Sequence, residues 1–298
     1  DREAMSALGE SGARTRLREV IEAYRQDWAG RDTSRPGQLT WWSARLGERF
    51  ISDITAEDVR LALNDFAGGL ALRWDGIASG GRSKFTSRGT PRRPATVNRM
   101  KAALSSLFKW AIEEGIAHRN PAREVRARPE NNKRLRYLSE EELLRLQDAC
   151  RKSDWDRLYL LVLMALMTGA RQGELLNLRW EHIDFTQRTA MLEKTKNGDR
   201  RALTLPYPVV EELMRYRMPD GLLFPGLKRR DKPRNFKRHW LAALQAADIQ
   251  NFRFHDLRHT AASYLAMNGA TLLEIGEVLG HRNLETTRRY AHLSIDHK

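Results

Sequence analysis

Apolar residues recur at helical spacing along much of the N-terminal half of the chain. The stretches Leu17–Ala29, Thr55–Ala67 and Thr96–Glu114 each place apolar residues three or four positions apart, as one face of a helix requires. The second stretch opens with Thr55 and Asp58, a spacing typical of a helix N-terminus. The third carries the longest stripe, formed by Val97, Met100, Leu104, Leu107, Phe108, Ala111 and Ile112. The pattern therefore predicts a helical bundle.

The second half combines further helical patterns with one strand-like region. A capping box at Ser139 precedes the apolar run Leu158–Met167, which is too short for a bilayer needing about 20 residues and indicates a buried helix. Between two strand-like runs, Arg188–Pro206 contains Asn197-Gly198, a strong signal for a β-hairpin. Four more helices are expected at Asn235–Ala247, Asp256–Met267, Leu272–Leu279 and Leu284–Ala291.

Two basic segments interrupt these patterns. The segment Gly76–Pro94 holds four glycines, two prolines, five basic residues and no acid, which predicts a phosphate-attracting loop or, alternatively, a solvated insertion. The segment Arg119–Arg136 holds seven basic residues, and its prolines at 121 and 129 should prevent a helix there. We therefore expect domains at 1–118 and 137–298, joined by an extended linker at 119–136. The predicted fold class is mostly α, with a small antiparallel sheet in a mixed α/β C-terminal domain.

The net charge of the chain indicates which class of molecule it binds. The chain of 298 residues has 52 Lys and Arg against 38 Asp and Glu, a net charge of +14, which favours a polyanion such as DNA. No amphipathic segment suggests a membrane surface, and no signal peptide is visible at the start. The single cysteine, Cys150, excludes an internal disulfide. These features predict a cytoplasmic protein.

Four separated segments carry the candidate chemistry. "TGARQGELLNLRW" contains Arg171 and Glu174, at the spacing of an ordinary helix salt bridge. The predicted hairpin carries Lys196 beside its turn, where a lysine is usually solvated. "LGHRNLETTRRYAHL" contains His281 and Tyr290, and a lone tyrosine near a C-terminus is usually a core or surface residue. Taken alone, each of these residues has an ordinary structural explanation.

The fourth segment, "FHDLRHTAASYL", places His255, Arg258 and His259 on one face of a helix. His-x-x-x-His is also a zinc spacing. A metalloprotease would need glutamate where this chain has Asp256, Arg258 would set a permanent cation beside the metal, and no third ligand is evident. We therefore predict that the chain binds no metal.

Taken in order, these segments resemble the catalytic set of the tyrosine recombinases, the phage integrase family. "HDLRHTAAS" and "LGHRNLETTRRYAH" are similar to that family's two C-terminal signature boxes, and "TGARQGELLNLRW" resembles its first arginine box. The helices of Leu17–Glu114 resemble its core-binding domain. The resemblance implies the DNA breaking-rejoining fold, with a core DNA-binding domain at 1–118 and a catalytic domain at 137–298. The implied catalytic residues are Arg171, Lys196, His255, Arg258, His281 and Tyr290.

The chemistry of strand exchange explains these residue types. Tyrosine can replace a phosphodiester by an ester of similar energy, so Tyr290 is the implied nucleophile. A free phenol has a pKa of about 10 and is ionised in roughly one molecule per thousand at pH 7, so it needs nearby cations and a base. We interpret Glu174 as a residue that orients the active-site arginine, and His259 as structural support.

The remaining roles follow the charges of phosphoryl transfer. Two guanidinium groups match the non-bridging oxygens of the phosphate better than lysines would. By resemblance, Lys196 protonates the departing 5′-oxygen, with Lys194 on the same strand face as the alternative. His255 is then a general base or proton shuttle, and His281 donates to the phosphate.

The sequence thus predicts a site-specific recombinase that cleaves DNA through a 3′-phosphotyrosyl intermediate without any cofactor. Its partners would be double-stranded DNA with specific recombination sites and other copies of the chain, as a homotetramer during synapsis and a monomer when free. The alternatives are a type IB topoisomerase-like enzyme and a non-catalytic DNA-binding protein. Candidate DNA contacts lie in the basic segments, at Arg82, Lys84, Arg88, Arg92, Arg93, Arg126, Arg128, Lys133, Arg134 and Arg136.

Overall fold

A computed structural model describes residues 15–30, 32–77, 83–131, 134, 136–192, 200–281 and 283–295. Residues 72–77, 83–85, 294 and 295 are described by their backbone only. The chain divides into two compact units, residues 1–132 and 133–298, called unit 1 and unit 2 below. Each unit has its own hydrophobic core.

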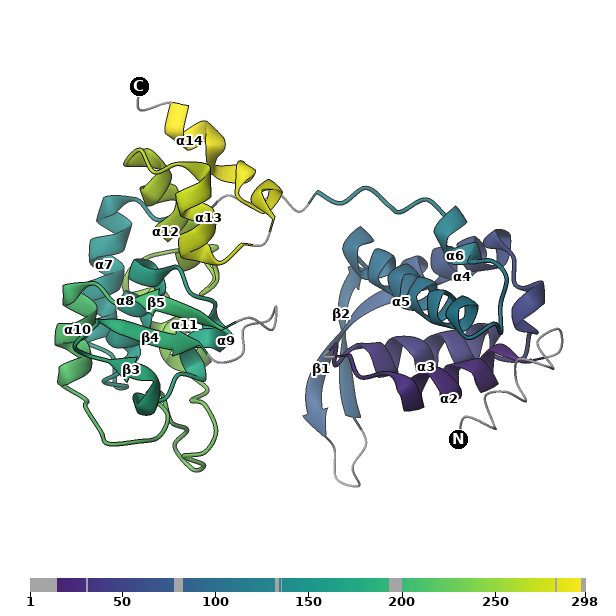
Figure 1. Ribbon diagram of the computed structural model, residues 1–298, viewed down its shortest axis with the longest axis horizontal. Helices are drawn as coiled ribbons and strands as arrows, with labels where there is room; N and C mark the ends of the chain where they lie inside the picture. The colour runs from purple at the N-terminus through teal and green to yellow at the C-terminus, as the bar shows by residue number, and fades with distance from the viewer. Residues whose placement is uncertain are drawn as a thin grey trace. The chain divides into compact units, whose positions relative to one another are not determined.

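Unit 1 is a small helical bundle (Figure 1). Its helices are α2 (Leu17–Asp27), α3 (Arg35–Leu46), α4 (Ala56–Gly68) and α5 (Pro94–Glu113), with a 3-10 turn η2 (Ile51–Asp53) before α4. Their apolar faces meet in one core whose largest buried side chains include Trp42, Phe108, Leu17, Ile21, Leu104 and Leu107. The predicted helices are therefore present, whereas α3 was not predicted from the sequence.

The segment Gly76–Pro94, expected to be a loop, belongs largely to an antiparallel ribbon. Strand β1 (Leu70–Ile77) pairs with β2 (Ser83–Pro91), with Trp74 opposite Phe85. Residues 78–82 lie outside the described residues. Thr86–Pro91 are all exposed, so this part of β2 has no buried face whose alternation would have revealed a strand in the sequence. The loop prediction was wrong for that reason.

Part of the expected linker also belongs to unit 1. Helix α6 (Pro121–Glu124) starts at Pro121, in the first turn, where the missing amide of proline removes no intrahelical hydrogen bond. Ala122 is fully buried in the core of this unit. Asn98 on α5 then accepts a 2.9 Å hydrogen bond from the Arg128 amide. The expectation that Pro121 would prevent a helix was wrong.

Unit 2 is mostly helical with one small sheet. Its elements are α7 (Glu140–Arg151), α8 (Leu158–Thr168), α9 (Gln172–Leu176), η3 (Trp180–His182), β3 (Ile183–Asp184), β4 (Thr189–Leu192), β5 (Arg201–Thr204), α10 (Tyr207–Met214), α11 (Lys237–Ala246), α12 (Asp256–Met267), α13 (Leu272–Leu279), η4 (Leu284–Thr286), η5 (Arg288–Tyr290) and α14 (Ala291–Ile295). The strands form an antiparallel sheet in the order β3-β4-β5. The fold class is that predicted from the sequence.

Helix α8 is the apolar centre of unit 2. Most of its side chains are buried, as the uninterrupted apolar run predicted, and α12 and α7 pack against it. Strands β4 and β5 pair as the predicted hairpin, with Leu192 opposite Arg201, while the segment 193–199 between them lies outside the described residues. Among the described residues, no helix has the length and apolar character that crossing a membrane demands.

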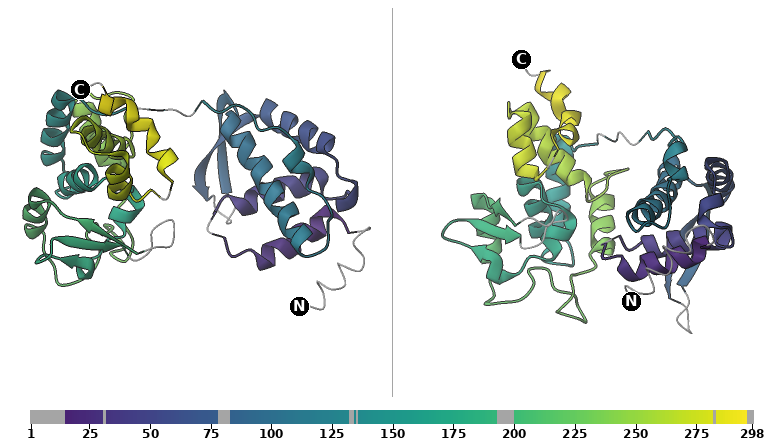
Figure 2. Two further views of the ribbon diagram at one scale, coloured as in Figure 1. Left: turned by 45° about the horizontal axis from the view of Figure 1, so that its top comes forward. Right: turned by 45° about the vertical axis from the view of Figure 1, so that its right-hand side comes forward.

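The C-terminal segment differs from its prediction. The expected helix Leu284–Ala291 consists of two separate 3-10 turns, η4 and η5, and the α-helical backbone of α14 begins only at Ala291. Asn283 caps η4 through its side chain, which accepts from the Glu285 amide. Figures 1 and 2 show α12, α13 and α14 gathered together at one end of this unit.

Candidate active site

Arg171 is held at the start of α9, directly after α8 ends. Gly169 terminates α8 with a left-handed backbone (φ 59°), which turns the chain so that Arg171 becomes the N-cap of the next helix. The Arg171 guanidinium donates to Glu174 Oε1 at 2.8 Å, and its amide donates to Oε2 of the same carboxylate at 2.9 Å. The Glu174 side chain is 5% exposed. Glu174 therefore contacts Arg171 through both carboxylate oxygens, and the orienting role expected for it stays a prediction.

Arg258 reaches the same place from α12. Arg258 is only 4% exposed, and its Nη1 donates to the Gly169 carbonyl at 2.7 Å. Burial, followed by the charge of Arg171, lowers the pKa of Arg258 to about 10, so the group remains positive at neutral pH. The Gly169 carbonyl, which Arg258 of the second box binds, thus lies two residues before Arg171 of the first box.

A third arginine, Arg201 on β5, was not predicted from the sequence. Its side chain is 17% exposed, with Nη1 donating to the Val278 carbonyl at 2.9 Å and Nη2 lying 3.7 Å from Glu174 Oε2. Its buried Nε and Nη2 have no hydrogen-bond partner among the described residues. Burial lowers the pKa of Arg201, and the Glu174 carboxylate opposes that shift. The only available sequence signal was a basic residue in the strand following the hairpin turn.

Gly280 and His281 connect this cluster to the end of α13. Gly280 has a left-handed backbone (φ 65°), and a Cβ placed there would lie 2.4 Å from Arg201 Nη1. His281 Nδ1 is 2.8 Å from the Thr287 hydroxyl oxygen. Burial, then Arg258 and Arg171, lower the pKa of His281 to about 4, so this imidazole is neutral at pH 7.

Tyr290 lies in η5 and is 1% exposed. Its ring belongs to a small apolar cluster that includes Ala262, Leu279 and Leu293. Burial raises the pKa of the phenol, and Arg289 and Arg258 oppose that shift. Tyr290 is thus part of a core, as a lone tyrosine usually is, and it also lies under the influence of the cations that a tyrosine nucleophile needs.

The two histidines of α12 differ in their surroundings. His259 Nδ1 lies 2.6 Å from Tyr290 Oη, and burial followed by the charge of His255 lowers the pKa of His259 to about 4. His255 is exposed at the N-cap of α12, with its ring 5.4 Å from that of His259. Partial burial and then Arg258 lower the pKa of His255.

The structure therefore brings together five of the six predicted catalytic residues. Four arginines lower the pKa of His281, which means that their charges act on one small region. These arginines are Arg258, Arg171, Arg289 and Arg201. The sixth residue, Lys196, and its alternative Lys194 lie outside the described residues.

The predicted DNA contacts of unit 1 fall into two groups. Arg88, Arg93 and Arg126 are exposed. The guanidinium of Arg92 stacks 4.1 Å from the centre of the Phe66 ring, and Arg128 donates to Asn64 at 2.8 Å. Arg82 and Lys133 lie outside the described residues, and so does the side chain of Lys84.

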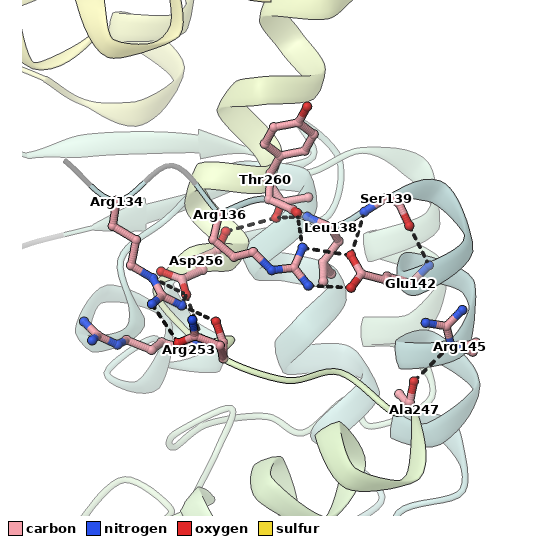
Figure 3. Close-up of polar contacts among 12 residues, drawn as sticks. Arg134, Arg136, Leu138, Ser139, Glu142, Arg145, Ala247, Arg253, Asp256 and Thr260 are labelled. Atoms are coloured by element: carbon pink, nitrogen blue, oxygen red, sulfur yellow. Dashed lines mark hydrogen bonds and ion pairs between the residues drawn. The ribbon is translucent and has the colours of Figure 1, made fainter.

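Arg134 and Arg136 instead bind carboxylates within unit 2 (Figure 3). Arg134 Nη2 donates to Asp256 Oδ2 at 2.8 Å, and Arg136 Nη1 donates to Glu142 Oε2 at 2.8 Å. These two guanidinium groups hold the first residues of unit 2 against α12 and α7. Their position favours an internal role over the predicted contact with DNA.

Comparison with known proteins agrees with this arrangement. Residues 136–297 match the model of the phage integrase family. The shufflon-specific DNA recombinase of Escherichia coli is 37% identical over 207 residues, covering 69% of this chain and 53% of that protein. The integrase of Salmonella phage P22 is 34% identical over 183 residues, covering 56% of this chain and 46% of that protein. The chain spans about half the length of these two relatives.

A solved structure extends the likeness in fold across both units. The Tn1549 transposon integrase, in complex with transposon right end DNA, superposes with a TM-score of 0.71 at 16% identity. The match covers 95% of this chain and 96% of that one. From the family match and the sequence relatives together, the chain belongs to the phage integrase family of tyrosine recombinases.

Proposed function

We propose that this protein is a site-specific DNA recombinase that cleaves and rejoins strands through a 3′-phosphotyrosyl intermediate. The strongest support is the charge of the site. Arg171, Arg201 and Arg258 surround one buried carboxylate, Glu174, so three positive charges face one negative charge and two remain uncompensated. Uncompensated buried charge is costly, and a phosphodiester is an anion that would neutralise it.

The arginines suit the transition state of phosphoryl transfer. A guanidinium has five N–H donors, and the described contacts use only part of those on Arg171 and Arg258. The remaining donors can bind the non-bridging oxygens, where negative charge accumulates. Because the Gly169 carbonyl and Glu174 already orient both groups, little reorganisation is needed when the phosphate arrives.

Tyr290 is the proposed nucleophile. Its oxygen would attack phosphorus, and the bond from phosphorus to the 5′-oxygen would break, leaving an ester that the freed 5′-hydroxyl can later reverse. Lys196 is the proposed proton donor to that oxygen, and Arg201 follows it by five residues in the chain. His281, neutral at pH 7, is the proposed donor to a phosphate oxygen.

The proposed partner is double-stranded DNA that carries a specific recombination site. The net charge of +14 and the names of the relatives support this partner. Four copies of the chain would assemble on two sites during strand exchange. We place the reaction in the cytoplasm, where DNA is accessible. The single cysteine, Cys150, is a free and buried thiol, and a chain with no partner cysteine for a disulfide fits a reducing setting.

The test is a covalent adduct on a suicide substrate nicked beside the cleavage site. Wild-type protein should form a protein–DNA adduct with its cognate duplex, and Tyr290→Phe should form none, because it lacks the attacking oxygen. Tyr264→Phe is the matched control, since that hydroxyl donates to the Leu138 carbonyl, and it should still form the adduct. Denaturing gel electrophoresis measures the product. Adduct formation by Tyr290→Phe would refute the assignment.

The same preparation separates recombination from its enzymatic alternative. A recombinase exchanges strands between two duplexes that carry the site. A type IB topoisomerase-like enzyme relaxes supercoils without exchange. A protein that binds the duplex without any adduct would be the non-catalytic alternative.

A further inference from the structure

We propose that His259 is the base that takes the proton from Tyr290 when the tyrosine attacks the phosphate. This inference rests on the proposed function and assigns to His259 a chemical step in place of the structural support expected from the sequence. The observation that carries it is direct contact: His259 Nδ1 and Tyr290 Oη are 2.6 Å apart. That separation is within the range required of a general base and its proton.

The framework around the pair is rigid. His259 stands between two residues of α12 whose side chains bind buried backbone: Arg258 donates to the Gly169 carbonyl at 2.7 Å, and Thr260 donates to the Asp256 carbonyl at 3.0 Å. On the other side, the Tyr290 ring is held by apolar packing. The alignment of nitrogen and oxygen is therefore set by the fold, as a proton-transfer pair requires.

The protonation state of His259 suits this role. Burial and the charges of His255, Arg289 and Arg258 lower its pKa to about 4, while Asp256 opposes the shift, so the imidazole is neutral at pH 7. A neutral ring whose Nε2 carries the hydrogen offers Nδ1 as an acceptor. Tyr290 can therefore donate its hydroxyl hydrogen to that nitrogen.

Binding of DNA strengthens the base. A phosphate beside the arginines brings negative charge close to His259, which opposes the cations that keep its pKa low. The pKa of His259 therefore rises toward its ordinary value when the substrate is present. The imidazole accepts protons most readily in the complex in which attack takes place.

The other two histidines have different contacts. Neither His255 nor His281 has a hydrogen bond to Tyr290 among the described residues. His281 Nδ1 is engaged with Thr287 at 2.8 Å, and His255 is exposed with its ring beside that of His259. His255 is therefore available to bind phosphate.

The proton balance of the step is complete. The Tyr290 oxygen forms a bond to phosphorus while its hydrogen moves to His259 Nδ1, which gives an imidazolium. The 5′-oxygen leaves with the electrons of the broken P–O bond and receives a proton from the proposed acid, Lys196. In rejoining, the 5′-hydroxyl attacks phosphorus and gives its proton back to the Lys196 amine, while the bond from phosphorus to the Tyr290 oxygen breaks. The His259 imidazolium then returns its proton to the phenolate that departs.

The experiment compares His259→Gln with wild type on the suicide substrate between pH 6.5 and 9. Removal of a general base reduces the rate of adduct formation by about 10²- to 10⁴-fold at pH 7, with unchanged DNA binding. The defect should shrink about tenfold for each pH unit, because ionisation of the phenol by solvent replaces the missing base. His259→Ala with added imidazole should regain part of the rate.

His255→Gln is the matched control, and its defect should not shrink with pH in this way. Three results would overturn the inference: a defect of His259→Gln that is independent of pH, a rate equal to wild type, or faster cleavage, which would make the contact a restraint on Tyr290. Thermal unfolding of each variant identifies any loss of folding. If a variant is partly unfolded, recovery of its rate with added imidazole tests the inference on the molecules that remain folded. Absence of any wild-type adduct would instead defeat the proposed function itself.

Discussion

At the scale of single residues, Glu174 is the buried carboxylate that lies among the arginines of the site. It is the carboxylate nearest to both Arg171 and Arg201, at 2.8 and 3.7 Å. Arg201 in turn binds the Val278 carbonyl, one turn before His281. A buried charge network of this kind fixes several side chains at once, so a change at Arg201 is expected to reach the histidine that follows α13.

Arg201→Gln should slow adduct formation by about 10- to 10³-fold, because it removes a preorganised positive group, while DNA binding changes little. The same substitution should raise the pKa of His281 from about 4, since Arg201 is one of the charges that lower it. An NMR titration of His281 measures that shift. Arg201→Lys should keep the low pKa, and Arg215→Gln, an exposed arginine paired with Glu212, is the neutral control. A rate of adduct formation equal to that of wild type would show that Arg201 takes no part in the reaction.

At the scale of elements, α12 supplies more of the site than any other described helix. It carries Arg258 and His259, and His255 is its N-cap. Its first turn is held by Asp256, which accepts from Arg134 at 2.8 Å and from the Arg253 amide at 2.8 Å (Figure 3). A carboxylate in this position also interacts favourably with the helix dipole. The N-terminus of α12 is thereby tied to the chain that enters unit 2.

Asp256→Asn should destabilise the protein by about 1.5–3 kcal/mol, the usual contribution of hydrogen bonds to a charged group. Asp256 is 3% exposed, so solvent cannot replace the missing charge. Asp231→Asn breaks a pair whose side chains are 67% and 62% exposed, and it should lower the free energy of unfolding much less, because solvent screens the two charges. Urea unfolding followed by circular dichroism measures both. Equal effects would mean that Arg134 and Asp256 form an ordinary surface pair.

At the scale of the whole molecule, the excess of 14 positive charges governs the encounter with DNA. Only part of that charge is free for a partner, because several of the predicted DNA-binding arginines are engaged inside the protein. Arg134 and Arg136 bind carboxylates, and Arg92 stacks on Phe66. The exposed arginines of unit 1 are therefore the better candidates for binding phosphate.

The triple variant Arg88→Gln, Arg93→Gln and Arg126→Gln should weaken the salt dependence of DNA binding. Each phosphate that the protein no longer neutralises reduces the slope of log K against log salt by about 0.9, so three such phosphates reduce it by about 2.7. A control triple variant replaces exposed arginines that have carboxylate partners: Arg60, Arg179 and Arg229. Fluorescence anisotropy across a salt series measures both. Identical slopes for wild type and the first variant would show that these arginines do not bind DNA.

Much of the architecture could be predicted from local patterns. The helices α12 and α13 have the predicted bounds, because a polar start and a glycine end lie next to each apolar stripe. Strand β2 escaped prediction because Thr86–Pro91 are all exposed and show no alternation. The turns η4 and η5 escaped prediction because 3-10 turns carry polar and apolar residues in a helix-like spacing. The predicted roles of the site residues and the predicted domain bounds stay predictions.

The order of amino acids was enough to identify the family and to predict a set of candidate site residues, since the arginine, histidine and tyrosine boxes carry their own spacing. Which of these residues touch one another depends on the folded chain. Arg201 joins the cluster through a carboxylate in α9 and a carbonyl in α13, and His259 meets Tyr290 across 31 positions of the chain. Such contacts depend on how α12, α13 and η5 pack in three dimensions, and no local pattern of side chains encodes that packing.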